Sequence, residues 1–137
     1  MKCNTTPRLV CELRADMPST LAAIEEFIRR FRLCQGNIRE KSAFAEELLL
    51  REALTNAAVH GNRGVSDRYV HCVVRRKPGR LVIAVWDDGS GFSWRDVLGS
   101  SAAPSVPGGR GIAIYQHYAT SVRFSSRGNG LTLIRRF

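Results

Sequence analysis

The stretch that decides the fold of this chain spans residues 52–61 and reads Glu52-Ala53-Leu54-Thr55-Asn56-Ala57-Ala58-Val59-His60-Gly61. Within it, Glu52, Asn56 and His60 recur at a spacing of four residues. On an α-helix this spacing places a carboxylate, a carboxamide and an imidazole on one side, with a drift of about 40° per step. The neighbouring side chains are apolar, so the polar side must line a solvated cavity or find buried partners.

Two glycine clusters follow this stretch along the chain. The first reads Asp87-Asp88-Gly89-Ser90-Gly91-Phe92 and comes directly after an apolar segment expected to be a strand. The second reads Gly108-Gly109-Arg110-Gly111-Ile112 and stands at the expected start of a helix. Glycine lets a ligand approach the backbone closely, and the N–H groups at a helix N-terminus face anions such as phosphate. Together, the three segments predict a nucleotide-binding site.

The side chains in these segments suit such a ligand. Asp87 can accept a hydrogen bond from an exocyclic amino group such as that of adenine. Asn56 offers an oxygen to a magnesium ion, which also binds substrate phosphates. Glu52 can accept a proton from a hydroxyl or water nucleophile, and the forked cation of Arg110 suits phosphate oxygens. Taken singly, each glycine cluster favours a structural role, as a strand-ending turn or as a loop before a helix. The polar trio alone is also compatible with side chains that satisfy one another.

Other features of the sequence narrow the class of protein. It contains neither GxxxxGK[ST] nor a complete GxGxxG after a first strand, which excludes a P-loop and a dinucleotide fold. A length of 137 residues predicts a single domain covering residues 1–137. We find no apolar run long enough to span a bilayer and no signal peptide, so we expect a cytoplasmic protein that does not bind membranes.

The net charge of +9 favours acidic partners. The basic residues are spread along the chain and are not interleaved with aromatic side chains, as a base-stacking platform would require. As explanations of the positive charge, we therefore rank a solvated basic surface first, an acidic protein partner second and nucleic acid last. We expect no direct contact with nucleic acid.

The chain has four cysteines, and none of them stand at CxxC spacing or in a cluster with histidine that would indicate zinc. An even number of cysteines permits disulfides, but nothing else in the sequence indicates secretion. We therefore expect buried or free thiols at Cys3, Cys11, Cys34 and Cys72.

Hydrophobic periodicity and turn residues predict five strands and three helices. The strands are expected at residues 8–15, 69–76, 80–86, 121–126 and 131–137, and the helices at residues 20–33, 40–60 and 111–118. Residues 93–109 are expected to form a loop. This order of elements indicates an α/β fold, built as an α+β two-layer sandwich with a mixed, mostly antiparallel sheet and helices on one face.

In order and spacing, these segments resemble the GHKL family of ATP-binding domains, which includes the ATPase domains of histidine kinases and type II topoisomerases. The resemblance rests on an asparagine box, two glycine boxes and a degraded closing Gly-Thr motif. In this chain they are Glu52…Asn56…His60-Gly61, Asp87-x-Gly89-x-Gly91, Gly109-Arg110-Gly111 and Gly130-Leu131-Thr132. The resemblance covers most of the chain and implies a Bergerat-type ATP-binding fold.

The resemblance also implies a role for each residue of the motifs. Glu52 would be the catalytic general base, Asn56 the magnesium ligand and Asp87 the residue that reads adenine. The other residues expected to contact ATP, at its adenine or its phosphates, are Gly89, Gly91, Gly109, Arg110, Gly111 and Thr132. Leu131 stands where such proteins usually have the first threonine of the closing motif, and this departure is expected to weaken nucleotide affinity.

Within the family, the size of the chain and the wording of the asparagine box are most similar to small stand-alone anti-sigma factor serine kinases. This similarity implies a bacterial protein-serine kinase that uses ATP and Mg²⁺, holds a sigma factor and phosphorylates a STAS-type anti-anti-sigma protein. It also implies a homodimer. Two alternatives stay open: a switch kinase that acts on a STAS scaffold and activates a phosphatase, and a nucleotide-responsive binding module without phosphotransfer.

Overall fold

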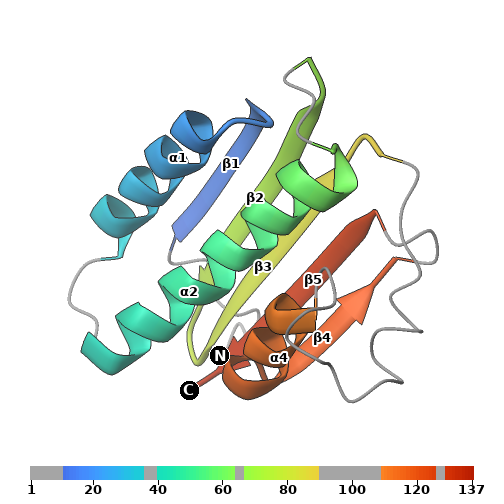
Figure 1. Ribbon diagram of the computed structural model, residues 1–137. Coiled ribbons are helices and arrows are strands. Elements are labelled where there is room, and N and C mark those ends of the chain that lie inside the picture. Colours follow the sequence, from blue (N-terminus) through green and yellow to red (C-terminus); the bar gives the residue numbers. More distant parts are fainter. Residues whose placement is uncertain (1–10, 36–39, 64–66, 90–108, 126–128) are drawn as a thin grey trace, which may run out of the picture.

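Five strands form one sheet in the computed structural model, which describes residues 11–35, 40–63, 67–89, 109–125 and 129–137. The strands lie in the order β1-β2-β3-β5-β4 (Figure 1). In chain order the elements are β1 (Cys11–Pro18), α1 (Leu21–Cys34), α2 (Glu40–Asn56), the π-helical turn η1 (Ala57–Gly61), β2 (Tyr69–Lys77), β3 (Arg80–Asp87), α4 (Gly109–Tyr118), β4 (Ser121–Phe124) and β5 (Gly130–Arg136).

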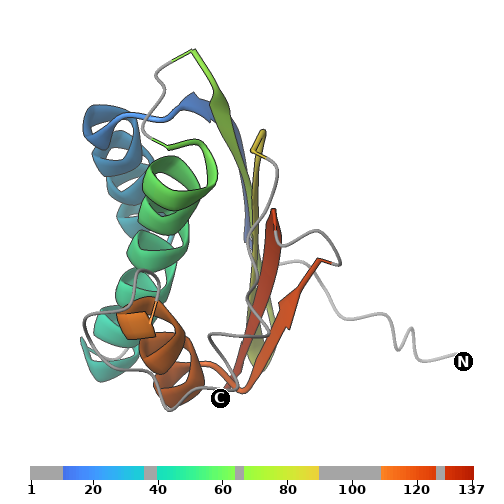
Figure 2. The same ribbon diagram turned by 45° about the vertical axis from the view of Figure 1, so that its right-hand side comes forward.

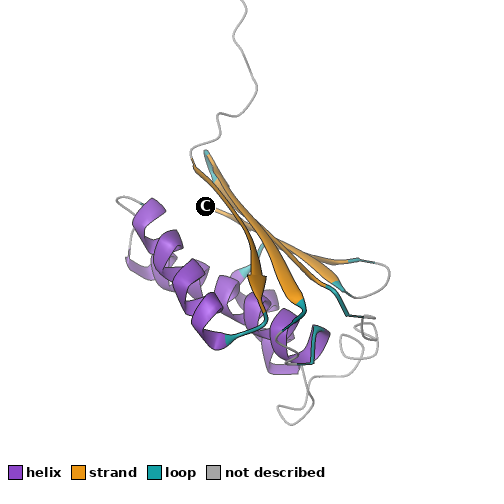
Figure 3. Cartoon of the chain, turned by 90° about the horizontal axis from the view of Figure 1, so that it is seen from above, coloured by secondary structure: helices purple, strands orange, loops and turns teal. Residues whose placement is uncertain are grey.

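The helices cover one face of the sheet, as Figures 2 and 3 show from two further directions. Strands β2 and β3 alternate between buried and more exposed residues, and their buried side chains point toward the helices. The core between the two layers contains Phe27 and Ile28 of α1, Leu49 and Leu54 of α2, and Ile83 of β3. The predicted two-layer α/β fold is confirmed.

The sheet is more uniform than the sequence predicted. All four pairings between described strands, β1 with β2, β2 with β3, β3 with β5 and β4 with β5, are antiparallel. The parallel component of a mixed sheet is thus not found in this part of the chain. Residues 93–108 of the expected loop lie outside the described residues. In the part of the chain that is described, no helix is long and apolar enough to cross a membrane.

The first strand and helix lie close to their predicted positions. β1 is described from Cys11 onward, and residues 8–10 of the expected strand lie outside the described residues. The strand continues to Pro18, which lacks an N–H group and is tolerated because the outward side of an edge strand needs no donor for pairing. Thr20 then caps α1, because its hydroxyl accepts a hydrogen bond from the backbone N–H of Ala23 at 3.2 Å.

The long central helix changes its geometry near its end. α2 stops at Asn56, and the next residues form a π turn in which the N–H of Asn62 donates to the carbonyl of Ala57 at 2.8 Å. Arg63 follows with a φ of 54°, in the left-handed region. Glycine usually occupies such a left-handed position at a helix end, but here the residue is an arginine.

The predicted strands β2 and β3 form an antiparallel hairpin, and Lys77 pairs with Arg80 across its turn. Pro78 restricts its own φ, and Gly79 adopts a φ of 78°, which suits the second central position of a type II turn. β3 returns alongside β2, so that its last residue, Asp87, reaches the same end of the sheet as η1 (Figure 1).

The expectation of free thiols is wrong for two of the cysteines. Cys11 at the start of β1 and Cys34 at the end of α1 form a disulfide, with Cα atoms 6.8 Å apart. The helix runs back along the strand, and this return brings two residues together that their sequence spacing does not mark as a pair. Cys72 is a buried free thiol, as expected, and Cys3 lies outside the described residues.

Candidate functional site

The end of η1 touches the end of β3 at one edge of the helical layer. A Cβ atom built on Gly61 would lie 2.0 Å from Oδ2 of Asp87, and one built on Gly89 would lie 2.0 Å from the carbonyl oxygen of Gly61. Real Cβ atoms do not approach other atoms so closely, so a side chain at Gly61 would have to displace the Asp87 carboxylate, and one at Gly89 would clash with the backbone of Gly61. The asparagine box and the first glycine box therefore meet in space through Gly61, Asp87 and Gly89.

Asp87 is held firmly at this junction. Its residue is 6% exposed, and its Oδ1 accepts a hydrogen bond from the N–H of Gly89 at 2.7 Å. Its backbone N–H donates to the carbonyl of Asn129 at 2.9 Å, which ties the end of β3 to the start of β5. Burial raises the pKa of Asp87, and the Gly89 hydrogen bond opposes this rise. A buried carboxylate so placed is an acceptor that gains from a ligand with an N–H donor.

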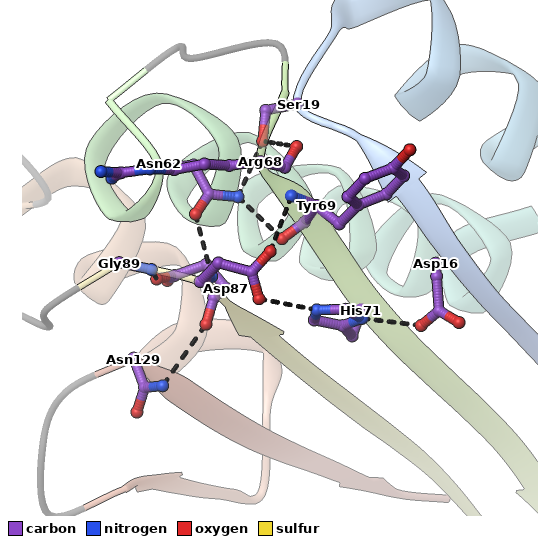
Figure 4. A network of polar contacts seen from close by, with 10 residues as sticks. Asp16, Ser19, Asn62, Arg68, Tyr69, His71, Asp87, Gly89 and Asn129 are labelled. Carbon is purple, nitrogen blue, oxygen red and sulfur yellow. Dashed lines mark hydrogen bonds and ion pairs between the residues drawn. The ribbon is translucent and has the colours of Figure 1, made fainter.

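Asn62 connects four segments around the junction (Figure 4). It is fully buried, and its Nδ2 donates to Oγ of Ser19 at 2.7 Å and to the carbonyl of Tyr69 at 2.8 Å. Its Oδ1 accepts a hydrogen bond from the N–H of Asp88 at 2.9 Å. One carboxamide thus fixes the turn before α1, the start of β2 and the backbone after Asp87.

A second polar group lies beside the junction on β2. His71 contacts Oδ1 of Asp16 through Nδ1 at 2.7 Å and Oδ1 of Asp88 through Nε2 at 2.9 Å (Figure 4). Its ring stacks on Trp86, with centroids 5.5 Å apart. Burial lowers the pKa of His71, but the hydrogen bonds to the two carboxylates raise it more, so the net pKa is raised. The His71 ring therefore links β1, β2 and the first glycine box.

Glu52 and Asn56 lie one turn apart on α2, as predicted, and both are partly exposed. Nδ2 of Asn56 donates a hydrogen bond to the hydroxyl of Tyr115 on α4 at 2.7 Å. Within the described residues, no hydrogen bond or ion pair engages the carboxylate of Glu52. His60 lies in η1 and is exposed, so it is not part of a buried polar trio.

The arginine beside Glu52 has a different role. Arg51 pairs with Glu25 of α1, and its Nη2 lies 3.4 Å from Oε1 of Glu47. Arg32 of α1 also pairs with Glu47. Arg51 therefore joins α2 to α1.

The second glycine box is described only in part. Gly109, Arg110 and Gly111 form the first turn of α4, which begins two residues earlier than predicted. Gly91 and the guanidinium of Arg110 lie outside what the structure describes.

The structure does not bring Thr132 to this side of the sheet. Leu133 is buried in the core and Leu131 packs against it, so alternation along β5 turns Thr132 to the face opposite the helices. There Thr132 lines a pocket of about 190 Å³ together with Trp86, Arg123 and Gly130. In the closing motif, Leu131 is the residue that faces the helical layer.

The residues in or beside the candidate site that were not predicted include Asn62, His71, Tyr115 and Asn129. Asn62 follows the end of η1, and its sequence position gives no indication of its burial. Tyr115 lies 59 residues from Asn56 in the sequence, and only the packing of α4 on α2 brings the two side chains together.

Comparison with known families agrees with this geometry. The model of the histidine kinase-like ATPase domain matches residues 14–135 of the chain. This match covers most of the chain and includes all the segments of the candidate site, so the chain belongs to the histidine kinase-like ATPase family. No curated protein matches the chain. The protein is thus an ATP-binding, kinase-like ATPase domain.

Proposed function

We propose that this protein is a bacterial anti-sigma factor with serine-protein kinase activity. In this role it binds ATP with Mg²⁺, holds a sigma factor and phosphorylates a serine of a STAS-type anti-anti-sigma partner. The observation that carries the enzymatic part is the pair Glu52 and Asn56 on α2, beside the contact between Gly61 and Asp87. A retained carboxylate at the position of the general base favours phosphoryl transfer.

The residues present fit ATP and a magnesium ion. Asp87 is a buried acceptor for the amino group of adenine, and Gly61 and Gly89 leave no side chain between the two boxes. Asn56 would supply an oxygen to the metal, since its nitrogen is already engaged by Tyr115. A bound Mg²⁺ neutralises charge on the phosphates. The first turn of α4 offers backbone N–H groups to phosphate oxygens.

The transfer step assigns one task to Glu52. The serine oxygen of the partner forms a bond to the terminal phosphorus of ATP, and the bond from that phosphorus to the oxygen of ADP breaks. Glu52 accepts the proton of the serine hydroxyl. Its carboxylate suits this task because no basic side chain among the described residues pairs with it.

We further propose that β1 and α1 form the contact surface for protein partners, including a second copy of the chain. Leu21 and Leu33, at the two ends of α1, are 71% and 75% exposed, and Phe44 on the neighbouring α2 is 61% exposed. Exposed apolar side chains on one layer support a protein contact there.

A binding module without phosphotransfer is the second candidate. Leu131 favours it, because an apolar residue faces the helical layer where the resemblance expects a threonine. Such a protein would bind nucleotide as a conformational ligand and would keep its partners without transferring phosphate.

An assay of the transfer of labelled phosphate from ATP to a STAS-domain protein distinguishes these functions. STAS-domain proteins encoded in the same genome are incubated with the wild-type chain, with Glu52→Gln and with Glu47→Gln. We expect Glu52→Gln to keep ATP binding and to lose transfer by about 100-fold or more. Glu47→Gln changes another carboxylate of the same helix and should keep both properties. Unchanged transfer by Glu52→Gln would show that Glu52 is not the general base. ATP binding without transfer by the wild-type chain would favour the binding module.

Co-purification with a sigma factor tests the regulatory part. The anti-sigma role predicts a complex of the chain with one sigma factor of the same genome, and this complex should separate when the matching STAS protein is added. Phosphorylation of a STAS protein without any sigma complex would instead indicate the switch kinase of a STAS scaffold.

A further inference from the structure

Tyr115 is a buried polar residue to which the sequence assigns no role. It lies on α4, is 1% exposed and belongs to the largest fully buried side chains. Its hydroxyl accepts a hydrogen bond from Nδ2 of Asn56 at 2.7 Å. A buried hydroxyl without a partner costs stability, so this bond also satisfies the tyrosine.

The bond fixes both ends of the Asn56 carboxamide. The group is planar, so a hydrogen bond at Nδ2 restricts the direction of Oδ1 as well. Burial raises the pKa of Tyr115 by more than the Asn56 hydrogen bond lowers it, and the nearby carboxylate of Glu52 adds to the rise. The phenol therefore keeps its proton at neutral pH, and its oxygen remains an acceptor for an amide N–H.

The bond also connects two boxes of the candidate site. Asn56 is the last residue of α2, and Tyr115 lies on the helix whose first turn is the second glycine box. Figure 1 shows α4 beside α2, on the same face of the sheet. A movement of α4 against α2 would therefore act directly on the carboxamide.

From this geometry we propose that Tyr115 is the positioning residue for Asn56: it holds Oδ1 toward the metal ion and couples this ligand to the phosphate-binding helix. This inference rests on the proposed binding of Mg²⁺ and ATP. In this role Tyr115 itself touches neither nucleotide nor metal. It holds the Asn56 side chain in one orientation before the metal binds, so that metal binding costs less conformational entropy.

Calorimetric titration with ATP, in the presence of magnesium or of EDTA, tests this role in Tyr115→Phe. The variant keeps the ring and removes only the hydroxyl. We expect ATP affinity in EDTA to stay within about twofold of wild type, while the gain in affinity from magnesium falls about 3- to 10-fold, the worth of one hydrogen bond. Tyr118→Phe removes a hydroxyl from the same helix and should leave that gain unchanged.

Several outcomes would overturn the inference. One is an unchanged gain from magnesium in Tyr115→Phe, with wild type showing the gain. Equal loss of affinity in magnesium and in EDTA would show a purely structural role. Absence of any magnesium effect in wild type would overturn both this inference and the proposed metal site. If Tyr115→Phe does not fold, the side-chain amide resonances of Asn56 in wild type decide: slow hydrogen exchange supports the inference, and rapid exchange contradicts it.

Discussion

Gly61 and Asp87 are in such close contact that a Cβ atom on the glycine would lie 2.0 Å from Oδ2 of the carboxylate. This contact joins the end of the central helix to the end of β3. It explains why the asparagine box ends in glycine, because any side chain at this position must displace the carboxylate. The position of Asp87 is therefore set by a residue of another box.

Gly61→Ala should weaken ATP binding, because the new methyl group pushes the Asp87 carboxylate away from its place. Loss of one hydrogen bond to a charged group corresponds to about 1.5–3 kcal/mol, or a 10- to 100-fold rise in Kd. Calorimetric titration measures this change. Gly79→Ala, in the β2–β3 turn at a φ of 78°, is the matched control: it should lower Tm and leave ATP affinity unchanged. Wild-type affinity in Gly61→Ala would refute the role of this contact.

Asp87→Asn should change both specificity and stability. Asparagine keeps an acceptor oxygen but adds an N–H donor, so the preference for ATP over GTP should fall, as competition binding will show.

Burial raises the pKa of Asp87, so the folded state favours the neutral acid more than the unfolded chain does. The stabilising contribution of this group is present below its unfolded pKa, near pH 4, and is lost as the pH rises through the folded pKa.

The same variant should therefore melt at a higher temperature than wild type at pH 7, and this advantage should shrink toward pH 4. Melting curves at the two pH values measure this difference. An equal difference at both pH values would show that the carboxylate is not penalised by burial, and an unchanged preference for ATP would remove its role in reading adenine.

The main framework of the fold could be predicted from the sequence because its determinants are local. Thr20 has the side chain of a helix cap, Pro78-Gly79 forms a turn, and the alternation along β2 and β3 marks their buried sides. The three boxes were recognisable because their residue types are limited by close approach and by the charge of a ligand.

The contacts that organise the site depend on tertiary packing and could not be predicted in this way. The burial of Asn62, the hydrogen bond between Asn56 and Tyr115, and the disulfide between Cys11 and Cys34 each join segments distant in the sequence. Thr132 is a further example, because the register of β5, and not its motif, decides which face the side chain takes.

His71 should make the stability of the protein depend on pH. The hydrogen bonds to Asp16 and Asp88 raise the pKa of His71 above that of the unfolded chain, in spite of burial. Its contribution is then complete below about pH 6 and is lost as the pH rises through the raised pKa. His71→Gln should therefore lower Tm more at pH 5.5 than at pH 9, and thermal unfolding at the two pH values is the measurement. An equal loss of Tm in His71→Gln at both pH values would contradict a raised pKa of His71 in the folded protein.

Reduction of the Cys11–Cys34 disulfide should destabilise the protein. The bond closes a loop with a sequence separation of 23, and the chain-entropy model gives about 3 kcal/mol for a loop of this size. Urea unfolding with and without dithiothreitol should show this difference in wild type and not in Cys11→Ser. An identical unfolding midpoint in reduced and oxidised wild type, with thiol titration confirming both states, would show that the bond contributes nothing.

The most direct test of the central claim is calorimetric titration of the chain with ATP and magnesium, in parallel with Asn56→Ala. We predict binding with a Kd on the order of micromolar, dependent on magnesium and lost in the variant. Gln116→Ala, at an exposed position of α4, should bind as wild type does. The absence of ATP binding in the wild-type chain, or unchanged magnesium-dependent binding in Asn56→Ala, would contradict the site described here.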